Sequence, residues 1–159
     1  MSMNIQEQFN KLSLGEKIII IAGPLFFVDG FLPWFDYDVP GGPSRNAWSG
    51  DFSFFSMLAV LVAIVMTAQI AVSRFTSIQL PALPQGVTWA RIHLGGAAYI
   101  ALAVVLRLVI GESVEGFGGS FDADMAFGLW IAVVLAAALV AGGFLMFQAE
   151  QKGGAGAAM

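Results

Sequence analysis

The sequence predicts an all-α membrane protein: a bundle of four transmembrane helices with short loops, preceded by a short interfacial helix at the N-terminus. Hydrophobic residues make up 58% of the 159-residue chain and charged residues only 11%, and the mean hydropathy is +0.80. Soluble domains have about 25% charged residues, so this composition excludes a soluble or disordered protein. The net charge of -4 provides no basic surface, and we expect no nucleic-acid partner.

Four apolar stretches approach the roughly 20 residues that a helix needs to cross a bilayer. They cover residues 18–35, 54–73, 89–110 and 125–147. Backbone polar groups in lipid must be satisfied within a span, and the stretches lack the alternation of a membrane β-barrel, so we expect helices. Residues 1–150 then form one membrane domain, and the Gly- and Ala-rich residues 151–159 form a flexible tail.

The first span has a recognisable beginning. Ser13 and Glu16 fit a capping box, in which each side chain bonds the backbone N–H of the other residue. Before it, Ile5, Phe9 and Leu12 fall at helical spacing among polar residues. This pattern predicts a short helix on the membrane surface, and a frayed terminus is the alternative.

The basic residues predict the orientation. Cytoplasmic loops of membrane proteins are enriched in Lys and Arg. Arg45 lies in the first outer loop, whereas the loops and termini on the side of the N-terminus contain Lys11, Lys17, Arg74, Arg91 and Lys152. We therefore expect both termini in the cytoplasm and the protein in the plasma membrane of a bacterium.

Asp29 is the most informative residue of the first span, because ionisable residues inside a membrane are functional candidates. Pro33, four residues later, cannot donate to the carbonyl of Asp29, so a carboxylate and a free carbonyl lie together. Arg107, near the outer end of the third span, is the expected donor. We favour a structural Asp29–Arg107 ion pair, and the alternative is an Asp29 that titrates or binds a cation during transport.

Gln69 and His93 form a second candidate pair. Both lie close to the cytoplasmic ends of their predicted helices. His93 and Arg107 are 14 residues apart, close to four helical turns, and therefore share one helix face. We expect His93 to be a hydrogen-bonded residue between helices, and a proton relay is the alternative.

Small residues predict where helices approach closely. The third span contains Gly95 and Gly96, and the fourth contains Ala132 and Ala136 at a spacing of one turn. We expect these residues to form a packing seam, either within the chain or between chains.

The sequence offers little other chemistry. It contains no Cys and one His, which excludes thiolate and multi-histidine metal sites, and we expect no metal and no cofactor. Asp122 and Asp124 could suggest a metal-binding Asp-x-Asp, but a helix cap explains them better. The inner loop contains Leu80-Pro81-Ala82-Leu83-Pro84, an extended segment that either stiffens the connection or binds a partner.

One region resembles a known group of proteins. It contains Asp29, Pro33-Trp34 and Asn46-Ala47-Trp48. It resembles uncharacterised four-helix integral membrane proteins of actinobacteria, which have an Asp-x-x-x-Pro-Trp segment at the end of helix one and an Asn-Ala-Trp in the first outer loop. The resemblance implies the architecture and the membrane location, and it implies no activity.

These observations favour a non-enzymatic membrane protein that acts as a structural, accessory or interaction subunit. Its expected partners are the lipid bilayer and other membrane proteins or further copies of itself. The alternative is a small oligomeric transporter, coupled to ions or drugs, that uses Asp29.

Overall fold

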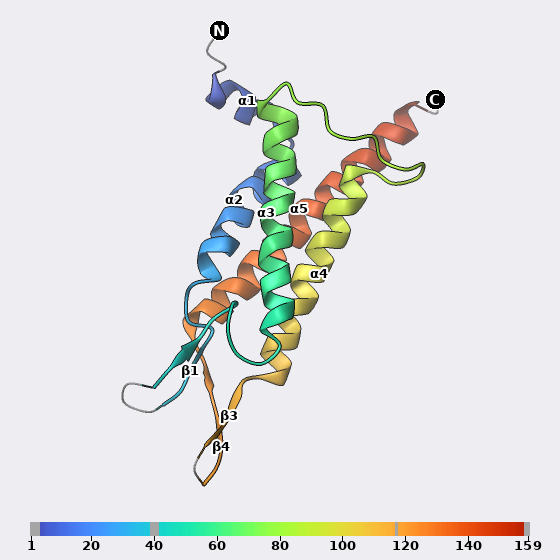
Figure 1. Cartoon of the computed structure of the whole chain (residues 1–159). Helices are drawn as coiled ribbons and strands as arrows, with labels where there is room; N and C mark the ends of the chain where they lie inside the picture. The colour runs from blue at the N-terminus through green and yellow to red at the C-terminus, as the bar shows by residue number, and fades with distance from the viewer. Residues whose placement is uncertain (1–3, 39–41, 117, 158–159) are drawn as a thin grey trace.

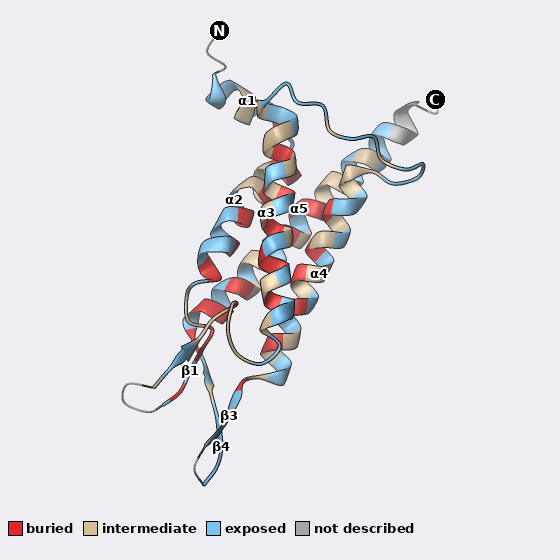
Figure 2. Cartoon of the chain, viewed as in Figure 1, coloured by how far each residue is buried: buried red, intermediate tan, exposed pale blue. Residues whose placement is uncertain are grey.

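The computed structural model describes residues 4–38, 42–116 and 118–157, and most of this part of the chain is helical (Figure 1). The helices are α1 (Ile5–Lys11), α2 (Leu14–Asp29), α3 (Ser53–Phe75), α4 (Trp89–Ile110) and α5 (Phe127–Ala157). Helix α2 packs against α3 and α5, and α4 packs against the same two helices. The buried residues face the space between these four helices, as Figure 2 shows.

Among the described residues, three helices are long and apolar enough to cross a membrane: Ser53–Phe75, Trp89–Ile110 and Phe127–Gly153. The first expected span, residues 18–35, differs from the structure, because α2 has 16 residues and ends at Asp29. Pro33 cannot continue the helical hydrogen bonds, and the chain leaves the helix through a turn in which Leu32 N donates to Asp29 O at 2.9 Å. The described part of the chain therefore has three helices of spanning length and not the four that the sequence predicted.

The N-terminus has the expected local structure. Ser13 N donates to Glu16 Oε2 at 2.8 Å, and Glu16 N donates to Ser13 Oγ at 3.3 Å, which is the capping box predicted from the sequence. Helix α1 precedes it, and Phe9 packs against the core.

Short strands form at the end of the bundle opposite the two termini (Figure 1). The strands β2 (Ser44–Arg45), β1 (Phe35–Asp36) and β5 (Asp124–Met125) form one antiparallel sheet in this order. The strands β3 (Ser113–Gly116) and β4 (Gly119–Asp122) form a separate hairpin. The all-α expectation missed these strands because segments of two to four residues carry no measurable periodicity.

The C-terminal part of the chain also differs from the expectation. Helix α5 continues to Ala157, so residues 151–157, expected in a flexible tail, are helical. Residues 158–159 lie outside the described part.

Candidate functional site

The guanidinium of Arg107 is the centre of a buried polar network at the end of the bundle opposite the termini. Arg107 lies in the last turn of α4, and its side chain is 1% exposed. Its Nη2 donates to Asn46 O at 3.3 Å and Ser49 O at 3.2 Å, and its Nη1 donates to the carbonyl oxygen of Asp51. One α4 side chain therefore holds the loop that joins β2 to α3.

Glu112 supplies the negative charge of this network. Its Oε2 lies 3.3 Å from Nη1 of Arg107, and its Oε1 accepts from Asp51 N at 2.8 Å. Gly50, at φ +92°, lies directly against this carboxylate, where a Cβ would overlap its atoms. The position therefore requires glycine both for its backbone conformation and for the close approach.

Trp34 connects the end of α2 to the sheet and to α5. Its Nε1 donates to Oδ2 and to the carbonyl oxygen of Asp29, both at 3.2 Å. Its backbone N donates to Arg45 O and its carbonyl accepts from Ala126 N, both at 2.8 Å. The indole is fully buried, so the Asp-x-x-x-Pro-Trp segment closes the end of the bundle opposite the termini.

The structure does not bring Asp29 and Arg107 together as predicted. In the described part of the chain, no hydrogen bond or ion pair joins them. The carbonyl that Pro33 leaves free accepts from Trp34, which follows the proline directly, and Arg107 is occupied by loop carbonyls and Glu112. Asp29 itself is 1% exposed, and its Oδ1 has no hydrogen-bond partner.

Gln69 and His93 do meet. His93 Nε2 lies 2.6 Å from Gln69 Oε1, and this contact bridges α3 and α4 near the end of the bundle that holds the termini. His93 is 1% exposed, and its Nδ1 is buried without a partner.

Two further polar pairs at this end were missed from the sequence. The guanidinium of Arg74 holds Glu16 Oε1 at 2.8 Å through both Nε and Nη2. Thr88 Oγ1 donates to Glu150 Oε2 at 2.7 Å and joins the start of α4 to α5. The sequence did contain a signal for the first pair: a basic residue ends one span and an acidic residue begins another.

The predicted packing residues take different positions. A Cβ at Gly96 would lie 3.0 Å from Met66 Sδ, so Gly96 faces α3 and not α5, whereas a Cβ at Gly95 would meet nothing within 4 Å. Ala132 and Ala136 are buried, at 0% and 3% exposure.

Further close helix contacts are made by glycines of α2 and α5. A Cβ at Gly143 would lie 3.1 Å from His93 O on α4, and a Cβ at Gly15 would lie 2.6 Å from Gly142 O. Adjacent glycines of α5 therefore face α2 and α4, which allows both helices to approach its backbone.

A groove between α3 and α4 has a volume of about 410 Å³. Its lining is apolar except for the Gln69–His93 pair. The lining residues are Leu58, Leu61, Val62, Val65, Met66, Gln69, Trp89, Ile92, His93 and Gly96. Within the described residues, no three side chains of His, Cys, Asp or Glu are grouped to hold a metal ion.

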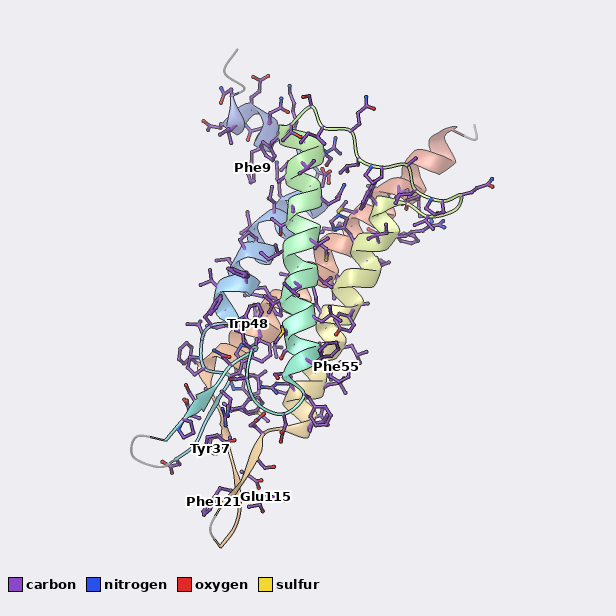
Figure 3. All side chains as sticks on the ribbon, in the orientation of Figure 1. Phe9, Tyr37, Trp48, Phe55, Glu115 and Phe121 are labelled. Atoms are coloured by element: carbon purple, nitrogen blue, oxygen red, sulfur yellow. The ribbon has the colours of Figure 1, made fainter. Side chains whose placement is uncertain are left out.

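The hairpin of β3 and β4 is exposed. Figure 3 shows Glu115 and Phe121 on β3 and β4, which project beyond the helices, and Phe121 is 59% exposed. Trp48, in contrast, lies against α2, with ring centroids 6.4 Å from Phe27 and 5.4 Å from Phe31.

Comparison with known proteins finds no match, neither to a protein family nor to a curated protein or a solved structure.

Proposed function

We propose that the protein is a non-enzymatic subunit of the plasma membrane, in which α2, α3, α4 and α5 all cross the bilayer and both termini are cytoplasmic. In this role it supports or organises other membrane proteins, or further copies of itself. The 16 residues of α2 extend about 24 Å at 1.5 Å per residue. The following turn and the buried Trp34 would complete the crossing, because their polar groups are bonded within the protein.

The observation that carries the proposal is the Arg107 network. A guanidinium, a carboxylate and three loop carbonyls are joined at 1–2% side-chain exposure of the charged pair, and Nε of Arg107 is buried without a hydrogen-bond partner. A buried guanidinium that is paired with a carboxylate stabilises a shape, and neither charge of the pair is free to bind a transported ion. The result is a rigid outer end that can present the exposed hairpin to a partner.

The outer faces of the helices support the same proposal. On α5, Phe127, Trp130 and Val134 are 57%, 54% and 67% exposed and follow helical spacing. In a bilayer such a stripe meets either lipid or another helix. A photo-crosslinking residue at Trp130, tested in living cells, should give one discrete adduct, and the absence of any adduct from each exposed α5 position would contradict a subunit role.

One observation favours a second function, a transporter that uses Asp29. The buried Oδ1 of Asp29 has no partner, as expected of a carboxyl group that gains and loses a proton or cation. Proteoliposomes with an internal pH-sensitive dye separate the two functions. If the protein is a subunit, the proteoliposomes should leak protons no faster than empty vesicles. A faster leak that Asp29→Asn abolishes would establish transport.

A further inference from the structure

The groove between α3 and α4 has the size of a ligand site. Its volume of about 410 Å³ lies within the range of about 300–1,000 Å³ that is usual for small-molecule pockets. Along α3 it extends from Leu58 to Gln69, which are 11 residues and about 16 Å apart. A groove of this shape fits a linear apolar chain better than a compact molecule.

The polar end of the groove has an unused donor. Gln69 and His93 are the polar side chains of the lining. Oε1 of Gln69 lies 2.6 Å from Nε2 of His93 and accepts from it in the tautomer that carries the proton on Nε2. The described residues provide no hydrogen-bond acceptor for the amide nitrogen of the half-buried Gln69. An unsatisfied N–H group in hydrocarbon is costly, so a ligand with an acceptor oxygen would be favoured here.

The lack of Lys, Arg, Asp and Glu among the described lining residues restricts the chemistry of the ligand further. A ligand with a charged head group would lose its hydration without compensation. Trp89 lines the groove one helical turn before His93 on α4, and an aromatic side chain is a suitable neighbour for a planar ring. The matching ligand is therefore uncharged, with a ring carbonyl and a long apolar tail.

We propose that this groove binds an isoprenoid quinone. A ring carbonyl accepts from the Gln69 amide, the ring lies against Trp89, and the tail follows Leu61 and Leu58 along α3. This site depends only on the insertion of α3 and α4 in the bilayer and is separate from the proposed subunit role. A phospholipid has ester carbonyls as well, but the lining offers no basic side chain to its phosphate.

The test is thermal unfolding of the full chain in detergent during a titration with decylubiquinone, since a ligand that binds the folded state raises the Tm. We expect a saturable rise. Decylbenzene, which has the tail and a ring without carbonyls, should produce a much smaller rise. A rise of equal size with decylbenzene, or with added phosphatidylcholine, would overturn the quinone assignment.

Two variants locate the site, and a third variant is a matched control. Val65→Trp fills the groove from an exposed position and should abolish the rise, and Gln69→Leu should weaken the apparent affinity at least tenfold. Val134→Trp on α5 is the control, because Val65 and Val134 are 65% and 67% exposed, and it should bind as the parent does. If Val65→Trp and Gln69→Leu both keep the full response, the groove is not the site.

Discussion

Replacement of Arg107 by Met should destabilise the protein strongly. The side chains of Arg107 and Glu112 are 1% and 2% exposed. Loss of one partner of such a buried pair costs about 3–5 kcal/mol of unfolding free energy, because the other charge stays buried. Glu112 keeps its bond from Asp51 N, and water can reach the loop carbonyls at the bundle end, so we expect a value near the lower limit.

The double variant gives the sharper result. Glu112→Gln retains an oxygen for Asp51 N and removes only the charge, at a cost of about 1–3 kcal/mol for a lost charged hydrogen bond. With Arg107→Met in the same chain no charge is stranded, so the double variant should cost about 1–3 kcal/mol less than the sum of the single variants. Denaturant unfolding in a mild detergent measures all three free energies.

Asp29→Asn is the matched comparison. Asn can still accept from the indole of Trp34, and the described contacts do not join Asp29 to Arg107. The losses from Asp29→Asn and Arg107→Met should therefore add to within about 0.5 kcal/mol. Strong coupling between Arg107 and Asp29, with none between Arg107 and Glu112, would refute this assignment.

Further predictions concern helix packing and the outer end. Gly143→Leu should lower the Tm in detergent, because its Cβ would meet the α4 backbone at 3.1 Å. Gly95→Leu should be tolerated, because a Cβ there meets nothing within 4 Å. Equal Tm values would mean that the α4–α5 contact is misplaced. Trp34→Phe keeps most of the buried ring but removes the donor to Asp29, and urea unfolding should show a loss of about 1–3 kcal/mol; an unchanged free energy would show that this bond contributes nothing.

The parts of the structure that local patterns determine were predictable. The capping box needs only Ser13 and Glu16 at the right spacing, and the long helices follow from continuous apolar runs. Gln69 and His93 could be paired because both lie at a similar depth on helices adjacent in the chain. These inferences use side-chain type and position along a helix, which the sequence gives directly.

The partners of Arg107 were not predictable in the same way. Three of them are backbone carbonyls of residues 46, 49 and 51, and any residue type provides a carbonyl. Asp29 offered an obvious opposite charge, whereas Glu112, only five residues away in the chain, lies in the loop after the third predicted span. Its position just past Gly111, where α4 ends, was the signal that could have indicated a chain reversal toward Arg107.

The direction in which each small residue packs could not be predicted from the sequence either. Gly95 and Gly96 are adjacent and identical in type, but one faces open space and the other faces α3. A rotation of 100° per residue separates them on the helix, and low amphipathicity leaves that rotation undetermined when every face is apolar. The tertiary contacts of α3 and α5 with α4 determine the rotation of α4 about its axis.

The central claim, that the short helix α2 crosses the membrane with the other three, is tested most directly by cysteine labelling at its cytoplasmic end. The chain has no Cys, so single variants are unambiguous. In intact cells, a membrane-impermeant maleimide should label Ser44→Cys in the outer loop and should not label Ser77→Cys in the inner loop. Gln6→Cys on α1 should also stay unlabelled until the membrane is permeabilised. Labelling of Gln6→Cys from outside, together with Ser44→Cys, would show that only α3, α4 and α5 span the bilayer and would contradict the account.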